Sequence, residues 1–190
     1  MKKKLALGLA LILACGTLAG CGGSSDSSEG SSEGSGDGSV TAKVIDIDLT
    51  SEEYAFGVDK NQPELLDQVN GFIAKIQEDG TFDEICDKYF GGGEPEAVES
   101  AELDSSKDQL VVATNAAFEP FEYTKGDQYY GIDMEIAALL AEELGQELVI
   151  QNMDFDAVCL SVGQQKCDIA MAGLTVSEER KEYVTFSDTY

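Results

Sequence analysis

The spacing of apolar residues changes several times along this chain of 190 residues, and each change predicts a different element. Between Pro63 and Gly80 the apolar side chains recur at helical spacing, which is typical of an amphipathic helix. Asn61 is expected to cap its start, and Pro63 fits the first turn, where its missing N–H costs nothing. A second helix follows at once, because Thr81 and Glu84 form a capping-box pattern.

Strand and helix patterns alternate from Gln109 onward. Short apolar runs predict strands, and apolar residues at helical spacing predict the helices between them. The expected strands are residues 110–113, 147–151 and 169–172, the expected helices are residues 131–145 and 155–163, and an earlier strand is expected at residues 53–58. This alternation predicts right-handed crossovers and an α/β fold with a mainly parallel sheet flanked by helices. Ligands of such sheets bind at the carboxyl ends of the strands, where we expect residues 115–118, 154–155 and 173–175 to converge.

The stretch from Asp168 to Arg180 carries the most specific chemistry. We expect a strand that breaks at Gly173 and a helix that begins at Ser177, where free N–H groups and the helix dipole favour an anion. Thr175 adds a hydroxyl, and the guanidinium of Arg180 is able to grip a carboxylate with two parallel hydrogen bonds. These parts suit a small ligand that bears a carboxylate, although an ordinary strand-to-helix turn with a surface arginine has the same sequence pattern.

The N-terminal residues are set aside from the fold. Residues 1–20 combine three lysines, an apolar run and small residues, which is the pattern of a signal peptide for secretion. Residues 18–21 resemble the bacterial lipoprotein box, so Cys21 is expected to be acylated and to anchor the chain in the membrane. A plain signal peptide with a chance cysteine is the alternative. Residues 21–40 are rich in Gly, Ser and acidic residues and predict a flexible tether.

Charge and composition exclude several classes of function. The formal net charge is −25, and loss of the three lysines with the signal peptide takes it to −28, a value that repels nucleic acid and anionic lipid. The absence of histidine excludes His-based catalysis and His-ligated metals. Cys86, Cys159 and Cys167 lack the spacing of a metal site, so no metal or cofactor is expected. Three buried reduced thiols are expected there, and one disulfide with a free thiol is the alternative.

Two pairs of carboxylates stand close together in the sequence. Asp154 and Asp156 lie at a helix start and face different directions, so they are expected to cap the helix and not to act as an acid–base pair. Asp133 and Glu135 lie on the helix of residues 131–145 and are expected to be solvent-facing or structural. No catalytic residue is therefore expected.

From Gln109 onward the chain resembles the N-terminal part of the family 3 bacterial solute-binding proteins, the amino-acid receptors of ABC importers. The run GIDMEIAALLAEEL at residues 131–144 matches the signature of that family throughout. Four further runs are similar to other landmarks of the family in the same order: TNAAFEPFEY at 114–123, DFDAV at 154–158, AGLTVSEER at 172–180 and FSDTY at 186–190.

Residues 46–91 resemble the C-terminal end of the same family instead. The resemblance therefore implies lobe 1 of a type II periplasmic-binding-protein-like fold in permuted order, with the second lobe absent. On this interpretation residues 41–91 are the C-terminal part of lobe 1, residues 92–107 are an acidic linker, and residues 108–190 are the N-terminal part.

The resemblance also implies roles for individual residues. Arg180 would grip the α-carboxylate of an amino acid, while the Gly173 carbonyl and the Thr175 hydroxyl would help to hold its α-ammonium group. Phe118 and Phe155 match positions whose rings sandwich the ligand side chain, with simple core packing as the alternative.

Asn115 stands where some receptors for basic amino acids carry an acid, which favours a neutral polar or aromatic ligand. The implied function is extracytoplasmic binding of a free amino acid, without catalysis, for the permease of an ABC-type importer. Because a single lobe leaves half of the ligand in water, the expected affinity is millimolar or poorer. The alternatives are an enzyme of the same fold that resembles cyclohexadienyl dehydratase, and a truncated remnant without function.

Overall fold

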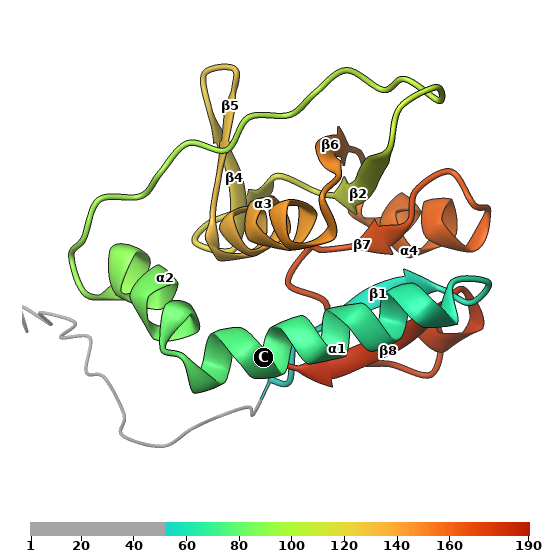
Figure 1. Ribbon diagram of the computed structural model, residues 1–190, viewed down its shortest axis with the longest axis horizontal. Coiled ribbons are helices and arrows are strands. Elements are labelled where there is room, and N and C mark those ends of the chain that lie inside the picture. The colour runs from blue at the N-terminus through green and yellow to red at the C-terminus, as the bar shows by residue number, and fades with distance from the viewer. Residues whose placement is uncertain (1–51) are drawn as a thin grey trace, which may run out of the picture. The chain divides into compact units, whose positions relative to one another are not determined.

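The computed structural model describes residues 52–190, whose elements are labelled in Figure 1. The strands are β1 (Ala55–Asp59), β2 (Gln109–Thr114), β3 (Ala117–Phe118), β4 (Glu122–Lys125), β5 (Gln128–Tyr130), β6 (Glu147–Asn152), β7 (Ile169–Ala170) and β8 (Val184–Thr189). The helices are α1 (Pro63–Glu78), α2 (Thr81–Phe90), α3 (Ile132–Leu144) and α4 (Phe155–Gly163), with one 3₁₀ turn, η1 (Arg180–Glu182). The predicted helices are present, except for the one expected to begin at Ser177.

Five strands form the main sheet in the order β6-β2-β7-β1-β8. β2 is parallel to β6 and to β7, whereas β1 runs antiparallel to both of its neighbours, β7 and β8. Four strands therefore share one direction, and only β1 opposes them. This confirms the predicted α/β fold with a mainly parallel sheet.

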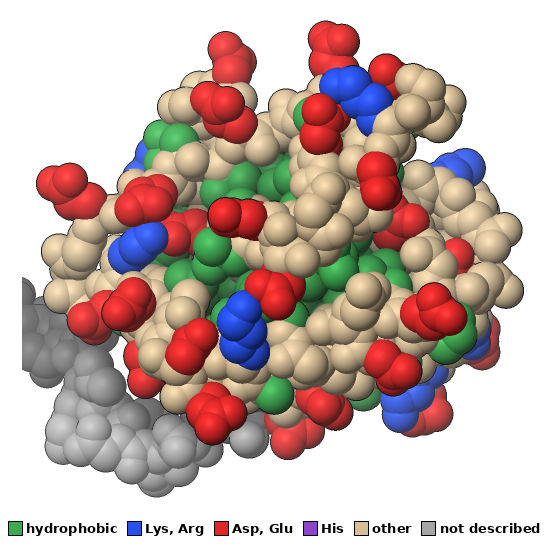
Figure 2. Space-filling view, viewed as in Figure 1, with side chains coloured by type: hydrophobic (Ala, Val, Ile, Leu, Met, Phe, Trp, Pro, Cys, Tyr) green, Lys and Arg blue, Asp and Glu red, His purple; other side chains and the backbone are tan. Residues whose placement is uncertain are grey.

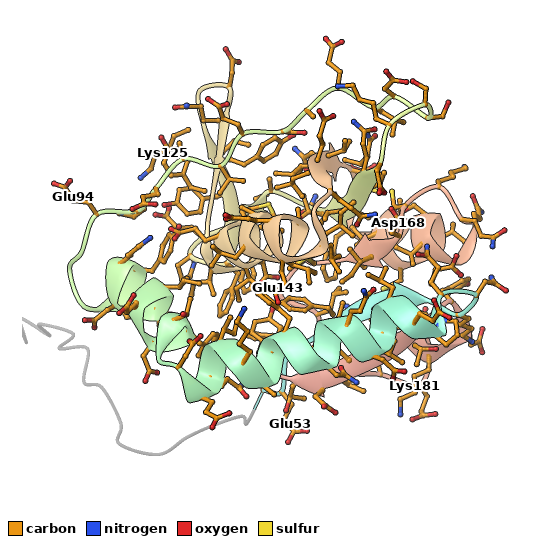
Figure 3. The ribbon with its side chains drawn as sticks, in the orientation of Figure 1. Glu53, Glu94, Lys125, Glu143, Asp168 and Lys181 are labelled. Carbon is orange, nitrogen blue, oxygen red and sulfur yellow. The ribbon has the colours of Figure 1, made fainter. Side chains whose placement is uncertain are left out.

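β1 joins two distant segments of the chain, because it precedes the linker and lies between two strands that follow it. The backbone N–H of Phe56 donates a 2.9 Å hydrogen bond to Ser187 Oγ in β8. Asp168, labelled in Figure 3, makes a second connection. Its Oδ1 accepts from Gln62 Nε2 and its Oδ2 from the backbone N–H of Val111, both at 2.8 Å. The segments before and after the linker thus build one sheet.

Helices cover both faces of this sheet. Alternate residues of a strand point to opposite faces, and Val112 packs in one apolar cluster while Ala113 packs in the other. The first cluster contains the apolar faces of α1, α2 and α3, including the predicted row on α1. The second cluster contains Val158 and Val162 of α4. The core is therefore a three-layered α/β/α arrangement.

A small second sheet, β3-β4-β5, was not predicted. It is a meander of very short antiparallel strands, and Phe118 on β3 pairs directly with Glu122 on β4. Directly opposed residues of an antiparallel pair project from the same face. The meander therefore places the side chains of Phe118 and Glu122 next to each other.

Two predicted helix caps are wrong. Gln62, and not Asn61, is at the N-cap position of α1, and its side chain donates to Asp168 and makes no cap. Asn61 instead donates both its N–H and its Nδ2 to Asp59 Oδ1. Thr81 is already inside α2, and its backbone N–H donates to Asp79 Oδ1 at 2.9 Å. Asp79 therefore serves the role that was expected of the Thr81–Glu84 capping box.

The acidic linker is docked along its length. Val98 forms a bridge with Tyr129 of β5 and is buried. Ser100 Oγ accepts a 2.8 Å hydrogen bond from the backbone N–H of Ile150 in β6. The linker in Figure 1 accordingly runs from α2 past the β4–β5 hairpin to β2.

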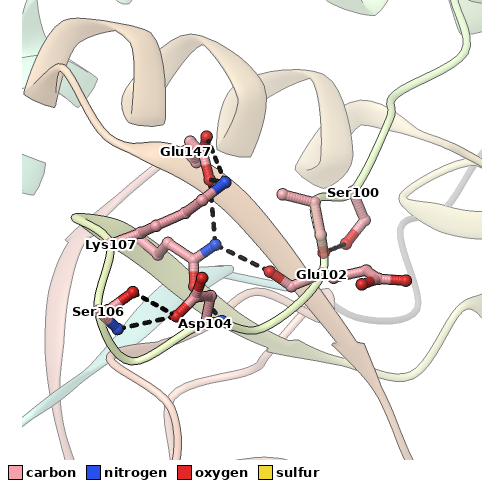
Figure 4. A network of polar contacts seen from close by, with 8 residues as sticks. Ser100, Glu102, Asp104, Ser106, Lys107 and Glu147 are labelled. Carbon is pink, nitrogen blue, oxygen red and sulfur yellow. Dashed lines mark hydrogen bonds and ion pairs between the residues drawn. The ribbon is translucent and has the colours of Figure 1, made fainter.

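A polar network fixes the end of the linker, as Figure 4 shows. Asp104 Oδ1 accepts hydrogen bonds from the backbone N–H and the hydroxyl of Ser106, at 3.0 and 2.7 Å. Lys107 Nζ lies 2.9 Å from Glu147 Oε2 at the start of β6. The exposed ends of this ion pair make its contribution to stability small, so its main effect is on the path of the chain.

The described surface is strongly acidic. Asp and Glu side chains are scattered over the face shown in Figure 2, whereas lysines appear at few places. Several lysines of the described residues pair with a glutamate, as Lys75 does with Glu143 at 2.7 Å. No helix within residues 52–190 combines the length and the apolar content that crossing a membrane requires.

The three cysteines of the described part are free thiols. Cys159 and Cys167 are buried, as expected, and burial raises the pKa of both. Cys86 is only partly buried, so the expectation of a third buried thiol is wrong. Cys21 and the tether lie outside the described residues.

Candidate functional site

The candidate site lies in the loop that follows β7. The helix expected at Ser177 is absent, and the only helical residues of this loop are those of the 3₁₀ turn Arg180–Glu182. Ser177 Oγ accepts a 3.2 Å hydrogen bond from the N–H of Arg180, and β8 begins at Val184, so the chain has room for a single turn. A 3₁₀ turn of this length has no appreciable dipole. Side chains must therefore provide the binding of any anion here.

Arg180 is the only arginine of the chain, and its guanidinium is held in place from two sides. Nη1 donates a 2.7 Å hydrogen bond to the carbonyl oxygen of Thr175. The guanidinium carbon lies 5.0 Å from the centre of the Phe155 ring, a favourable cation–π geometry. Within residues 52–190 it forms no ion pair with a carboxylate. Further N–H donors of this planar group remain for a ligand.

The two predicted aromatic residues are on the surface. Phe118 is 44 % exposed and Phe155 is 40 % exposed, so the alternative of simple core packing is wrong for both. The ring of Phe118 stacks on that of Phe121 at 5.5 Å between centroids. Phe155 begins α4 directly after Asp154, which occupies the N-cap position as expected but makes no side-chain capping hydrogen bond.

Gly173 lies at the centre of the site. Its φ of +50° is in the left-handed region, which favours glycine. A Cβ here would lie 3.0 Å from two carbons of the Phe118 ring and 3.8 Å from Glu122 Oε1. Its N–H donates a 2.9 Å hydrogen bond to Asp133 Oδ2. The glycine thus allows the close approach of the loop to Phe118.

Thr175 and Asn115 already have partners inside the protein. The hydroxyl of Thr175 donates to Glu52 Oε2 at 2.8 Å, and its backbone bridges Tyr54. The side chain of Asn115 donates from Nδ2 to the carbonyl oxygen of Met153 at 2.7 Å. The structure therefore brings Phe118 to Gly173, and Phe155 and Thr175 to Arg180, while Asn115 has no hydrogen bond to these residues.

A pair of buried carboxyl groups, which the sequence pattern does not reveal, lies beside Gly173. Asp133, which follows the first residue of α3, is fully buried, so of its two expected roles the solvent-facing one is wrong and the structural one is confirmed. Its Oδ1 accepts a 2.6 Å hydrogen bond from the hydroxyl of Tyr190, and its Oδ2 accepts from Gly173. Glu122 is 1 % exposed, and neither of its oxygens has a hydrogen-bond partner.

Burial sets the protonation of both carboxyl groups. Loss of hydration, and to a smaller extent the charge of Asp133, raises the pKa of Glu122 to about 10. Burial also raises the pKa of Asp133, to about 6, although the hydrogen bonds from Gly173 and Tyr190 lower it. Asp133 therefore carries the negative charge of the pair near neutral pH, and Glu122 carries the proton.

Glu135 is also buried, and it serves a structural role. Lys88 Nζ lies 2.6 Å from its Oε2, and the hydroxyl of Tyr89 donates to its Oε1 at 2.6 Å. These contacts join α2 to α3. The first turn of α3 thus contains two buried acids with different partners, and only Asp133 faces the candidate site.

A hollow of about 500 Å³ lies beside the guanidinium of Arg180. Phe155 and Tyr183 form part of its wall, and the carboxylates Asp156 and Glu179 line it too, whereas Phe118, Gly173 and Thr175 do not. Two other hollows lie away from these residues, one at the start of α1 and one between α2 and α3. No group of three metal-binding side chains occurs in the part of the chain that the structure describes.

Comparison with known proteins identifies the family. Residues 7–92 and 110–190 match the family model of the bacterial extracellular solute-binding proteins, family 3, and the chain belongs to this family.

The chain is similar in sequence to several curated proteins. The chain is 39 % identical over 87 residues to the arginine-binding extracellular protein ArtP of Bacillus subtilis, a match that covers 46 % of this chain and 34 % of the relative. It is 35 % identical over 82 residues to the cyclohexadienyl dehydratase of Pseudomonas aeruginosa, covering 43 % and 31 %. The chain thus spans about a third of the length of the curated relatives it matches.

Solved structures are also similar in sequence. The arginine-bound form of truncated ArgBP from T. maritima is 39 % identical, with a TM-score of 0.42, and the match covers 44 % of this chain and 40 % of that chain. The arginine-bound form of domain 1 from TmArgBP is 38 % identical, with a TM-score of 0.41 and coverage of 46 % and 71 %.

Proposed function

We propose that this chain binds a free amino acid outside the cytoplasm, as the receptor of an ABC-type importer. Membership of the solute-binding protein family supports this function, as do the names of the curated relatives. A lipid anchor at Cys21 would hold the receptor at the outer face of the membrane, with residues 21–40 as the tether. The receptor itself performs no chemistry, and its partners are the amino acid and the permease.

The state of Arg180 is the observation that carries the proposal. Arg180 forms no ion pair within residues 52–190, and its guanidinium contacts the Thr175 carbonyl oxygen and the Phe155 ring next to a hollow. A rigid guanidinium with free donors recognises a carboxylate with two parallel hydrogen bonds. We therefore assign the α-carboxylate of the ligand to Arg180.

We assign the other groups of the ligand to the loop after β7 and to two aromatic rings. The carbonyl of Gly173 and a lone pair of the Thr175 hydroxyl accept hydrogen bonds from the α-ammonium group. Phe118 and Phe155 provide exposed apolar faces for the side chain of the ligand. Each of these assignments uses a group that lies at the loop after β7 or directly beside it.

The side chain of the ligand is proposed to be cationic. The relatives ArtP of Bacillus subtilis and the arginine-binding periplasmic protein of Mannheimia haemolytica are named for arginine. The sequence predicts a neutral ligand from Asn115. In the structure, however, its amide donates a hydrogen bond to Met153 and is less available to contact the side chain of a ligand. Glu122, directly opposite Phe118, offers a carboxyl group for a cation instead. Arginine is therefore the first ligand to test.

We further propose that the described domain is lobe 1 of such a receptor in permuted order. Residues 41–91 would be its C-terminal part, residues 92–107 the linker and residues 108–190 its N-terminal part. The position of β1 between β7 and β8 supports this arrangement. One lobe contacts only one side of a ligand, so the affinity of this chain alone is expected to be millimolar or poorer.

Ligand-observed NMR of the full-length chain in detergent tests the function. Saturation-transfer titrations with arginine, lysine, glutamine and phenylalanine are expected to give the strongest binding for arginine. Arg180→Ala is expected to remove binding of every amino acid, whereas Lys181→Ala, which loses the exposed pair of Lys181 with Glu178, serves as the matched control. Absence of binding for all four ligands, or equal binding by both variants, would contradict the proposal.

A second candidate is an enzyme of the cyclohexadienyl dehydratase type. The similarity to the Pseudomonas aeruginosa dehydratase and a protonated carboxyl group, Glu122, next to the site favour it. A neutral carboxylic acid is able to act as a general acid. Incubation with prephenate or arogenate distinguishes the candidates: the receptor leaves both unchanged, and the enzyme releases the aromatic product. A chain that does not fold when purified would instead indicate a remnant without function.

A further inference from the structure

Glu122 is the one buried carboxyl group of the site without a partner. Both of its oxygens are buried and lack hydrogen bonds, although the side chain lies directly opposite the exposed ring of Phe118. Glu122 Oε1 would lie 3.8 Å from a Cβ on Gly173, and the Phe118 ring would lie 3.0 Å from the same point. The carboxyl group thus lies just beneath the contact between the binding loop and the Phe118 ring.

The groups around Glu122 leave it no cation. Asp133 faces it from α3, Tyr190 from the end of β8, and Tyr54 from the residue before β1, with Glu52 next to Tyr54. Each of these groups is acidic or neutral. No lysine or arginine of residues 52–190 forms an ion pair with Glu122 or Asp133.

The hydrogen bonds decide which member of the pair holds the proton. Asp133 accepts one donor on each oxygen, Tyr190 on Oδ1 and Gly173 on Oδ2, and both bonds stabilise its ionised form. Glu122 receives no donor and lies near this charge. Two like charges in one buried site are unfavourable, so Glu122 is neutral when the site is empty.

We propose that Glu122 exchanges its proton for the cationic side chain of the ligand, so that binding of a cationic amino acid releases a proton to solvent. The inference rests on the proposed function and adds a specificity residue to it. The neutral acid of the empty site becomes a carboxylate paired with the guanidinium, and the total charge of the site is unchanged. A shift of the exposed Phe118 ring away from Gly173 gives the guanidinium access to the Glu122 carboxyl group. A neutral side chain of the same shape has no charge to exchange and releases no proton.

Arginine and citrulline provide the comparison, because they share the α-carboxylate and the α-ammonium group and differ in the charge of the side chain. Titration of the full-length chain in detergent by saturation-transfer NMR gives both dissociation constants between about pH 6 and about pH 8.5. Release of one proton raises the affinity for arginine about tenfold per pH unit in this range. The affinity for citrulline is expected to stay constant within about twofold, since the titration of shared groups affects both ligands equally.

Glu122→Gln separates the role of this residue from effects on folding. The variant keeps the shape of the side chain and has no proton to release, so the affinity for arginine is expected to lose its pH dependence. Glu119→Gln is the matched control, because it removes an exposed acid from the same turn, and it should keep the wild-type pH profile. A thermal melt of each variant verifies that it is folded.

The outcomes distinguish this inference from the proposed function. If arginine binds with a pH profile parallel to that of citrulline, proton exchange is wrong and the receptor function stands. The same conclusion follows if Glu122→Gln keeps the wild-type profile for arginine. If neither ligand binds at any pH but glutamine or phenylalanine does, the exchange is wrong and the receptor function stands; if no amino acid binds, both are wrong.

Discussion

The hydroxyl of Tyr190 donates a 2.6 Å hydrogen bond to Asp133 Oδ1, which joins the residue after β8 to the first turn of α3. The other oxygen of Asp133 accepts from Gly173 in the binding loop. The ring of Tyr190 also stacks on Phe56 of β1 at 4.3 Å between centroids. A single buried carboxylate therefore connects the site loop, the helix and two strands.

Loss of this carboxylate is expected to destabilise the fold. Asp133→Ala leaves the N–H of Gly173 and the hydroxyl of Tyr190 without acceptors, and we expect a loss of about 2–4 kcal/mol in the free energy of unfolding. Tyr190→Phe removes one bond to a charged group and is expected to cost about 1–3 kcal/mol. Urea unfolding measures both, with Asp127→Ala in an exposed turn as the control. Equal stability of Asp133→Ala and the control would refute the assigned role of Asp133.

Gly173→Ala is expected to displace Phe118. The left-handed φ costs about 1 kcal/mol for alanine, and the new Cβ would meet the Phe118 ring at 3.0 Å. Gly126→Ala is the matched control, because its φ of +62° gives the same backbone cost and no atom lies within 4 Å of its Cβ. Both variants should lose similar stability, and only Gly173→Ala should weaken amino-acid binding. Equal binding by the two variants would show that the contact with Phe118 is unimportant.

The buried acid Glu122 makes the free energy of unfolding fall as pH rises. Its pKa is raised from 4.5 to about 10 on folding, so between these values the native state binds more protons than the unfolded state. The free energy of unfolding therefore decreases with pH across this window. Glu122→Gln removes the effect, so its free energy of unfolding relative to the wild type is expected to rise by about 4 kcal/mol between about pH 4.5 and about pH 8. Urea unfolding at both values tests this, and a difference that is independent of pH would contradict the neutral acid.

Phe155→Leu tests whether the Phe155 ring holds the guanidinium of Arg180 in position for the ligand. The ring lies 5.0 Å from the guanidinium carbon, and its loss removes an attraction of about 0.5–1 kcal/mol at this partly exposed position. We expect amino-acid affinity to fall about two- to fivefold while stability changes little, because the side chain is 40 % exposed. Gln164→Ala, exposed at the C-cap of α4 and outside the lining of the hollow, is the control for α4. A similar loss of affinity in the control would assign the effect to the helix and not to the ring.

Much of the fold was predictable from the spacing of apolar residues. The helix expected at residues 155–163 is α4 with the same bounds, and the helical row that begins at Leu65 is the buried face of α1. The meander of β3, β4 and β5 was not predicted, because strands of two to four residues are too short to show alternation. The prediction of a helix at Ser177 was wrong, because local hydrogen bonds and the start of β8 limit the chain to one turn.

The site was predictable only in part. Arg180, Thr175 and Gly173 lie together in one loop, and their residue types alone indicate a carboxylate ligand. Asp133 and Glu122 gave no such signal, since α3 is buried on most sides and its acids do not stand apart in the apolar pattern. Their pairing arises from the contact of α3 with the meander, which spacing along the chain does not reveal.

The central claim is that Arg180 binds the α-carboxylate of an amino acid, and a comparison of arginine with agmatine tests it most directly. Agmatine keeps the guanidinium and the amine and lacks the carboxylate, so NMR titration of the wild-type chain should show binding of arginine at least about tenfold stronger than that of agmatine. In Arg180→Ala arginine should lose this advantage and bind no more strongly than agmatine. A preference for arginine that survives in Arg180→Ala would contradict the account, because the carboxylate would then be recognised elsewhere.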